Sequence, residues 1–154
     1  MQNLHLFSVK NKIDFQSNCN LFEASTFYEC AFIQDNKIIL FKKNNCFLKF
    51  KDLKSLKIKK KDLYFLGKKN NTIFIGASIS LKKLKELSKD KSFALVNLRD
   101  CINLVNNEQV SYLSSLFFLA KWKKENKFCS KCGAKNKFKN MKNFLECSNR
   151  TCLK

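Results

Sequence analysis

Short runs of apolar, β-prone residues alternate with polar turns over the first 97 residues of the chain. Aromatic and β-branched side chains dominate these runs, and the turns between them are rich in Asn, Asp and Lys, which is typical of strands joined by tight turns. Two pairs of runs predict β-hairpins, at residues 27–33 with 37–41 and at residues 63–67 with 72–76. Further strands are predicted at residues 46–50 and 93–96.

Helical spacing of apolar residues marks two short segments beside these strands. Ser80 can cap a helix over residues 81–88, in which leucines recur every three residues on one face. A helical turn is predicted at residues 97–104, directly after the strand at 93–96. The chain therefore begins as a mixed structure with few helices.

A longer helix is predicted from about residue 108 to residue 124, after a break at Asn106-Asn107. Its apolar residues share one broad face. They are Val110, Leu113, Leu116, Phe117, Leu119 and Ala120. This width predicts a deeply packed helix, and the lysines of its last turn suit the negative end of the helix dipole. The predicted fold class is α+β, with a small mixed N-terminal domain of β-hairpins and few helices.

Length and composition limit the possible classes of protein. A chain of 154 residues and 18.0 kDa suits one domain with a small metal-stabilised module, and 45% apolar residues permit a real core. The longest dense apolar stretch, residues 112–120, is much shorter than the roughly 20 residues of a membrane-spanning helix. The first seven residues lack the pattern of a secretory signal. We expect a cytoplasmic protein with no membrane partner.

The net charge of +19 has two interpretations. Excess positive charge is typical of nucleic-acid-binding proteins. However, only Arg99 and Arg150 among the 31 basic residues are arginines, and the chain is also rich in Asn and Phe and poor in Gly and Pro. An AT-rich genome would produce the same composition, so the second interpretation is coding bias on a solvated surface.

Four of the eight cysteines lie within 24 residues, in the spacing of a zinc ribbon. Cys129 and Cys132 form one Cys-x2-Cys pair, and Cys147 and Cys152 form a second pair with four residues between them. Four thiolates suit tetrahedral zinc, and Gly133 allows the tight turn of the first pair. A hairpin over residues 137–146 would join the pairs. The competing interpretations are a redox Cys-x-x-Cys and an iron–sulfur site.

The predicted zinc is structural, because four thiolates leave no open position for water. About 28 residues cannot fold on a core of their own, so the metal supplies the stability of the ribbon. The other four cysteines are scattered and are expected to pack as free thiols. They are Cys19, Cys30, Cys46 and Cys101.

Positive charge is concentrated around the predicted ribbon. Residues 121–154 carry eleven basic and two acidic residues, a net charge of +9, whereas the preceding 120 residues carry a net charge of +10. One interpretation is that the lysines balance the zinc–thiolate centre. The other is contact with the phosphates of RNA or of a dinucleotide.

Several short segments stand in the order found in a known family. They are Leu98-Arg99-Asp100, Ala120-Lys121-Trp122, Phe128-Cys129-Ser130-Lys131-Cys132-Gly133 and Cys147-Ser148-Asn149-Arg150-Thr151-Cys152. This order resembles the middle of the NADH pyrophosphatases, the Nudix hydrolases that carry a zinc ribbon. In that family a helix ending near a Trp leads into F-C-x-x-C-G, and some members have C-S-N-x-x-C as the second pair. The resemblance is specific over residues 98–154 and loose over residues 1–97.

The resemblance implies three parts: an N-terminal α+β domain at residues 1–97, connecting helices at 98–126 and a zinc ribbon at 127–154. In the family a catalytic Nudix domain follows, in which the glutamates of G-x5-E-x7-R-E-x-x-E-E-x-G hold Mg²⁺ or Mn²⁺. The chain stops at Lys154, where that region should begin, and none of its three glycines opens such a box. We therefore expect the chain to be inactive alone, with no catalytic residue of its own.

By resemblance, the parent enzyme would split NAD(H) into NMN(H) and AMP, and it could remove NAD caps from RNA. The ribbon region supports a homodimer in the family, so the expected partners are a second copy or a Nudix catalytic domain. NAD(H) or NAD-capped RNA would bind only together with that domain. The residues of this chain that bind a nucleotide cofactor are not identified by the resemblance.

A second hypothesis is a stand-alone zinc-ribbon protein that binds nucleic acid through its basic surface. The lysines that would carry this binding are Lys131, Lys135, Lys137 and Lys139. No other catalytic constellation is visible in the sequence. His5 is the sole histidine and is expected to be exposed near the terminus, and Trp122 is expected to pack between the long helix and the ribbon.

Overall fold

The structure is a computed structural model that describes residues 27–41, 45–49, 58–88, 92–139 and 142–152. Its strands are β1 (Phe27–Gln34), β2 (Lys37–Phe41), β3 (Leu48–Lys49), β4 (Leu63–Lys69), β5 (Thr72–Ser78), β6 (Phe93–Val96), β7 (Asn136–Lys139) and β8 (Phe144–Cys147). Its helices are α1 (Leu81–Ser88), α2 (Leu98–Cys101) and α3 (Asn107–Glu125), with a 3₁₀ turn η3 at Lys60–Asp62. The predicted α+β class is confirmed. The predictions for His5 and Cys19 lie outside the described residues.

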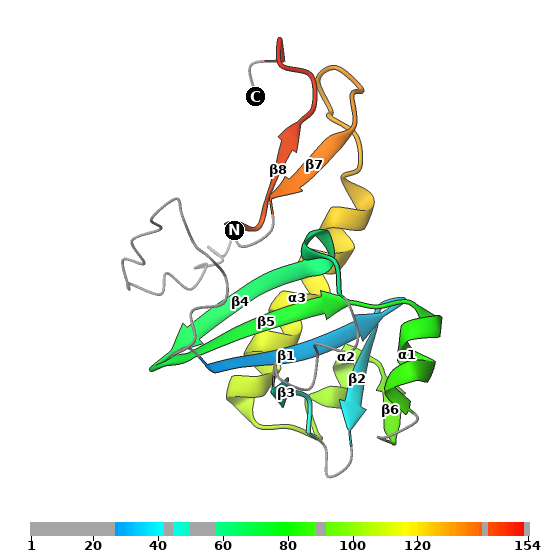
Figure 1. The fold of residues 1–154 in the computed structure, drawn as a ribbon, viewed down its shortest axis with the longest axis vertical. Helices are drawn as coiled ribbons and strands as arrows, with labels where there is room; N and C mark the ends of the chain where they lie inside the picture. Colours follow the sequence, from blue (N-terminus) through cyan, green and yellow to red (C-terminus); the bar gives the residue numbers. More distant parts are fainter. Residues whose placement is uncertain (1–26, 42–44, 50–57, 89–91, 140–141, 153–154) are drawn as a thin grey trace, which may run out of the picture.

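Strands β1 to β6 form one mixed sheet, in the order β4-β5-β1-β2-β6, with β3 also paired to β1 (Figure 1). Both predicted hairpins are confirmed, β1 with β2 and β4 with β5. The turn of the first hairpin places Asp35 and Asn36 at φ 46° and 66°, the left-handed pair that suits the twist of a two-residue hairpin. The central pairing is parallel, between β1 and β5.

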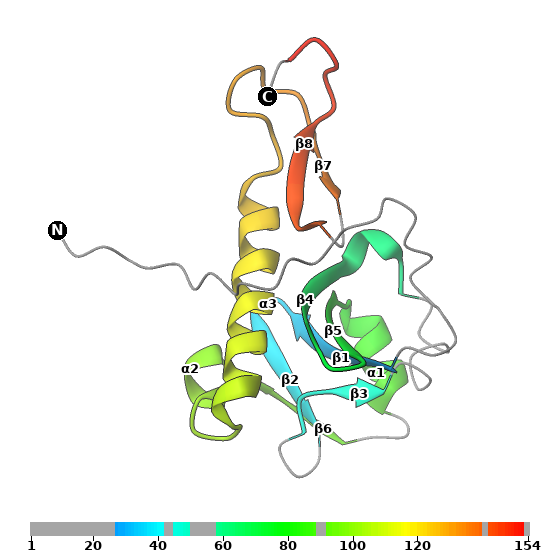
Figure 2. The ribbon, with the colours of Figure 1, turned by 90° about the vertical axis from the view of Figure 1, so that its left-hand side faces the viewer.

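The sheet has a hydrophobic core on each face, since neighbouring residues of a strand point in opposite directions. Cys30 and Phe32 of β1 belong to one core with Leu84 of α1. Ala31 and Ile33 belong to the other core with the leucines of α3. Figure 2 shows α1 and α3 on opposite sides of the sheet. Burial on both faces explains why the strands read as nearly continuous apolar runs.

The predicted strand at residues 46–50 is only partly confirmed, because β3 begins at Leu48. Cys46 and Phe47 are buried but precede the strand. The side chain of Asn45 accepts a hydrogen bond from the Phe47 backbone amide at 3.0 Å. The backbone carbonyl of Asn45 accepts one from the Phe41 backbone amide at 2.7 Å. These two bonds hold the chain in a turn where continuous pairing was predicted.

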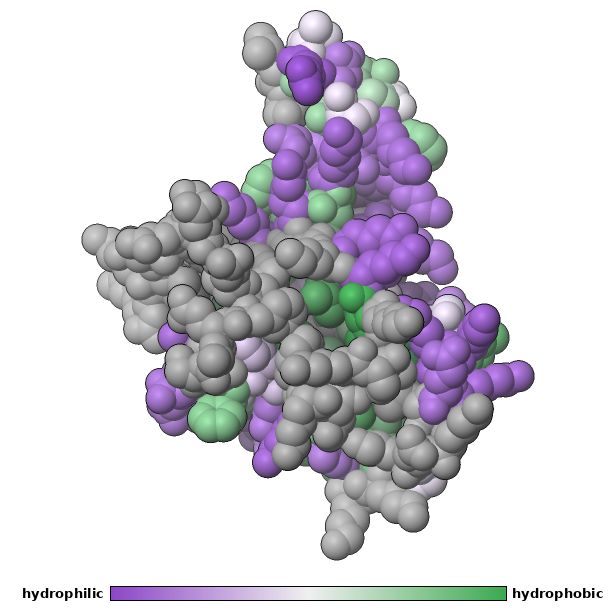
Figure 3. Space-filling view, in the orientation of Figure 1, coloured by the Kyte–Doolittle hydropathy of each residue, from purple (hydrophilic) through white to green (hydrophobic). Residues whose placement is uncertain are grey.

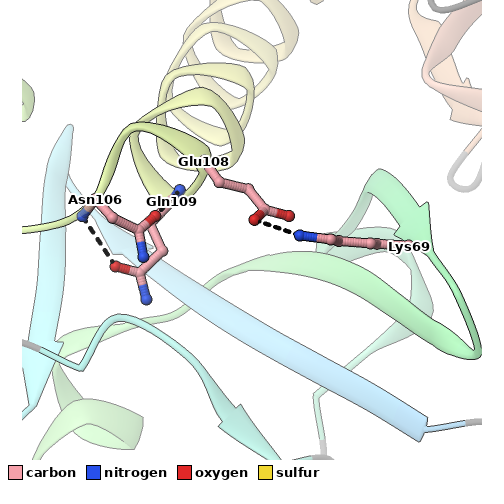
Figure 4. Close-up of polar contacts among 4 residues, drawn as sticks. All are labelled: Lys69, Asn106, Glu108 and Gln109. Atoms are coloured by element: carbon pink, nitrogen blue, oxygen red, sulfur yellow. Dashed lines mark hydrogen bonds and ion pairs between the residues drawn. The ribbon is translucent and has the colours of Figure 1, made fainter.

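The long helix α3 begins one residue earlier than predicted, at Asn107, because Asn106 caps it. The Asn106 side chain accepts from the Gln109 amide at 2.9 Å, and the Gln109 side chain accepts from the Asn106 amide at 3.3 Å (Figure 4). This reciprocal pair is a capping box. Leu113 and Leu116 are fully buried against the sheet, which confirms the predicted deep packing.

The β7–β8 hairpin extends from the end of α3, beyond the sheet (Figure 2). We call residues 127–152 the ribbon, and the described residues from β1 to α3 the sheet domain. Within the described part of the chain, no helix is long and apolar enough to cross a membrane.

Candidate metal centre

The first cysteine pair lies in a tight turn between α3 and β7. The Cys129 amide donates to the Ala134 carbonyl at 2.7 Å, and the Gly133 amide donates to the Cys129 carbonyl at 2.9 Å. Gly133 has φ 71°, the left-handed region that only glycine enters without strain, so the role predicted for it is confirmed. The turn directs the side chains of Cys129 and Cys132 toward the same point.

The second pair accommodates its wider spacing through Asn149. The Asn149 side chain accepts hydrogen bonds from the amide and the hydroxyl of Thr151, at 3.1 and 2.7 Å. The Asn149 carbonyl accepts from the Cys152 amide at 3.1 Å, which returns the chain toward Cys147 at the end of β8. Sequence reasoning did not assign this role to Asn149, although an Asn two residues before a Thr is a recognisable turn signal.

The four sulfur atoms form one compact group within 4.8 Å of one another. The Sγ atoms of Cys129 and Cys152 are 3.7 Å apart, and those of Cys132 and Cys147 are 3.5 Å apart. A disulfide would need about 2.05 Å, so these are free thiols. Zinc at about 2.3 Å from each sulfur of a tetrahedron requires sulfurs about 3.8 Å apart. The predicted ligand set therefore lies where it can hold one metal ion.

The thiols of this group differ in how readily they ionise. The backbone amides of Cys132 and Lys131 lower the pKa of the Cys129 thiol to about 6, because they stabilise its thiolate. Burial raises the pKa of the Cys152 thiol to about 12, and the neighbouring Cys132 and Cys129 contribute to that rise. Four thiolates in one place repel each other, so full ionisation of the group needs a cation at its centre.

The ribbon surface around the centre is basic. Lys131, Lys135, Lys137 and Lys139 are all exposed. Lys139 pairs with Glu146 across the hairpin at 2.7 Å. Hydrophilic side chains cover much of the ribbon on the face seen in Figure 3.

The remaining described cysteines lie far inside the sheet domain. Cys30, Cys46 and Cys101 are fully buried, which confirms that they pack as free thiols. Burial raises the pKa of all three, to about 12 for Cys46 and about 11 for Cys101. Such thiols are poor nucleophiles and poor metal ligands.

The ribbon is joined to the sheet domain by aromatic and polar contacts. The Trp122 ring meets the Phe138 ring edge-on, with ring centres 6.4 Å apart, as expected for a residue packed between helix and ribbon. From the turn between β7 and β8, Asn143 accepts from the Phe65 amide at 3.2 Å and donates to the Phe65 carbonyl at 2.6 Å. Sequence reasoning missed Asn143, because nothing local marks a bond across 78 residues.

Neither a scan against protein-family models nor a search of curated proteins finds a match to this chain.

Proposed function

We propose that this chain is the non-catalytic N-terminal and zinc-ribbon region of a Nudix-type NADH pyrophosphatase. The observation that carries the proposal is the four-thiol centre. It follows a long helix, and its four cysteines come from the two motifs that resemble those of the family. The chain supports folding, dimerisation and substrate binding by a Nudix domain that performs the chemistry. That chemistry is the cleavage of NAD(H) into NMN(H) and AMP, with NAD-capped RNA as a second substrate.

Zinc is the proposed occupant of the centre, and its role is structural. A tetrahedral set of four sulfurs suits zinc or iron, and a closed tetrathiolate leaves no position for a reacting water. Apart from Cys129, no described residue of the ribbon is buried, so the ribbon has no core that could replace the metal. Binding of the ion is therefore coupled to folding of the ribbon.

Catalysis is assigned to a Nudix domain and to no residue of this chain. The sequence contains only Gly67, Gly76 and Gly133, and none begins the glutamate-rich box that binds Mg²⁺ or Mn²⁺. Gly67 and Gly76 lie in β4 and β5, where they pack beside α3. Gly133 shapes the metal turn. The proposal therefore expects no hydrolysis of NADH by the 154-residue chain.

Metal content tests the first part of the proposal. Purified chain should contain one zinc per molecule by native mass spectrometry, without the visible absorption of an iron–thiolate centre. Cys132→Ala should lose the zinc, whereas the matched Cys101→Ala, at a buried cysteine of the sheet domain, should keep it. Iron in place of zinc, or equal metal loss in both variants, would contradict the assignment.

An assay of the protein isolated from its source tests the second part. We expect it to occur with a Nudix domain, either as a continuation of roughly 100 to 150 residues or as a separate chain, and to release AMP from NADH. The 154-residue chain alone should release none. NADH hydrolysis by that chain, or a native protein of 18.0 kDa with no Nudix partner, would overturn the proposal.

A second candidate function is nucleic-acid binding, which the arrangement of lysines on and directly before β7 favours. Lys135, Lys137 and Lys139 alternate along the exposed side of the ribbon, with a spacing of about 7 Å. Only Lys139 among them has an ion-pair partner within the described residues. Changing all three to Glu should abolish binding of single-stranded RNA at about 50 mM salt while zinc is retained. Absence of binding by the unchanged chain would remove this candidate.

A further inference from the structure

A cavity of about 540 Å³ lies between the ribbon and the sheet domain, away from the metal ligands. Five parts of the chain line it: the turn between β1 and β2, the start of β4 with η3, the end of β5, the end of α3, and the ribbon. Its volume is in the range of sites that bind small molecules in proteins.

Part of the cavity lining is positively charged. It is formed by Lys124, Lys127 and Lys135, none of which has an ion-pair partner among the described residues. The helix dipole explains a lysine in the last turn of α3, such as Lys124. It does not explain Lys127 and Lys135, which follow the helix. Three unpaired ammonium groups around one cavity favour an anionic ligand, such as a phosphate group.

Other residues that line the cavity carry acceptors and hydroxyl groups. Asp35 and Asn36 come from the β1–β2 turn, Asp62 from η3, and Ser78 from the end of β5. The Asp35 carboxylate accepts a hydrogen bond from the Gln34 amide side chain, which fixes its direction. Carboxylates repel a bare anion but accept hydrogen bonds from hydroxyl groups. A ligand that satisfies both kinds of group therefore carries a phosphate and hydroxyl groups.

Lys123 links three of the parts of the chain that line the cavity. The Lys123 ammonium lies 5.1 Å from the ring centre of Tyr64 in β4 and 4.6 Å from that of Phe138 in β7. It also donates to the backbone carbonyl of Lys61. A cation between two aromatic rings holds the end of α3 against both the sheet and the ribbon. The backbone of these parts is therefore held in place, whereas the exposed side chains of Lys124, Lys127 and Lys135 become ordered when a ligand binds.

We propose that this cavity binds a hydroxyl-bearing phosphate ester, of the size of a sugar phosphate or a mononucleotide. Lys124, Lys127 and Lys135 hold the phosphate, and Asp35 and Asp62 accept hydrogen bonds from the hydroxyl groups. The site is separate from the metal centre and does not depend on the proposed family, so either proposal can fail without the other.

Titration of the metal-loaded chain by calorimetry tests the site. Ribose 5-phosphate should bind about tenfold more tightly than inorganic phosphate or ribose. Inorganic phosphate would contact only the lysines, and ribose would contact only the acceptor groups. AMP at the same affinity would identify a sugar-phosphate site, and AMP at a higher affinity would identify a nucleotide site. Failure of both esters to bind, or no advantage over inorganic phosphate, would overturn the proposal.

Matched variants locate the binding. Lys135→Gln and Lys124→Gln should each weaken ribose 5-phosphate about tenfold, whereas Lys121→Gln, on the same helix but outside the cavity, should not. Asp35→Asn should weaken ribose 5-phosphate but not inorganic phosphate, and Asn tolerates the positive φ at this position. Equal weakening by Lys121→Gln, or tighter binding of both ligands by Asp35→Asn, would show attraction to general surface charge and would contradict the site. Zinc content and melting temperature confirm that each variant is folded.

Discussion

The sheet domain encloses two hydrophobic cores, with Phe32, Leu113 and Leu116 fully buried. In the ribbon, by contrast, Cys129 is the only buried residue among those described, and Phe138 and Leu145 are half-buried beside the sheet domain. The sheet domain is thus stabilised by apolar surface removed from water, whereas we propose that the ribbon is stabilised by a metal ion bound at its four thiols. We therefore expect the two regions to respond to different treatments.

Removal of the metal should have the largest effect and should affect one region only. Structural zinc contributes roughly 10–16 kcal/mol to the folding of small zinc modules, and the ribbon has no core to replace it. After chelation, backbone amide signals of the ribbon in an NMR spectrum should collapse to unfolded positions. Signals of β1, β2 and β5 should stay in place. Simultaneous unfolding of both regions would show that they are one unit.

A substitution that removes a buried side chain from the core should destabilise the sheet domain and leave the metal site unchanged. Leu116→Ala removes a fully buried side chain between α3 and the sheet and should cost about 2–5 kcal/mol of unfolding free energy. Leu81→Ala, at an exposed leucine that begins α1, is the matched control and should cost less than about 1 kcal/mol. Chemical denaturation measures both. Zinc affinity should be the same in the two variants, and a large loss in Leu116→Ala would show that the core supports the metal site.

The contact between the regions can be weakened without damage to either. Asn143→Gly removes both hydrogen bonds to the Phe65 backbone, each worth about 0.5–1.5 kcal/mol, and glycine keeps the positive φ of 48° at this position without strain. Hydrogen exchange should quicken at Phe65 and at β7 and β8, with zinc content and the melting temperature of the sheet domain nearly unchanged. Unchanged exchange at Phe65 would show that Asn143 does not hold the two regions together.

The smallest effect on stability is expected at the start of α3. Asn106→Ala removes the capping box and should cost about 1 kcal/mol, because the first amides of the helix lose their acceptor. The Lys69–Glu108 ion pair lies beside it at 2.6 Å (Figure 4), but both side chains are about half exposed. Lys69→Gln should therefore cost less than Asn106→Ala, since exposed pairs contribute little. Thermal denaturation of both variants gives the order, and the reverse order would contradict this account.

Much of the local structure could be predicted, because neighbouring residues determine it. Both hairpins, the short helix after Ser80 and the long helix follow from periodicity and turn residues within a few positions. The metal turn around Gly133 follows in the same way, since cysteine spacing and one glycine specify it. The predicted start of β3 was wrong by two residues, because the Asn45 side chain accepts a hydrogen bond from the nearby Phe47 amide and Cys46 and Phe47 do not pair with a neighbouring strand.

The long-range arrangement could not be predicted from these patterns. Nothing in the apolar runs indicates that β1 lies at the centre of the sheet and pairs in parallel with β5, about 45 residues later. The same holds for Asn143, whose partner Phe65 lies in a distant strand. The cavity beside the ribbon also depends on this arrangement, because its carboxylates, Asp35 and Asp62, are about 60 to 100 residues away in the sequence from its lysines at 124, 127 and 135.

The parallel pairing of β1 with β5 also has a kinetic consequence. β1 cannot complete its hydrogen bonds until the chain has closed a loop of about 40 residues, and α3 covers the sheet only later in the sequence. The four thiols lie within 24 residues and close a much shorter loop. Because folding rates fall as contacts become more distant in sequence, the ribbon should capture its ion before the sheet domain is complete. The metal turn is then already formed when α3 reaches the sheet, and docking joins two units that folded at different speeds.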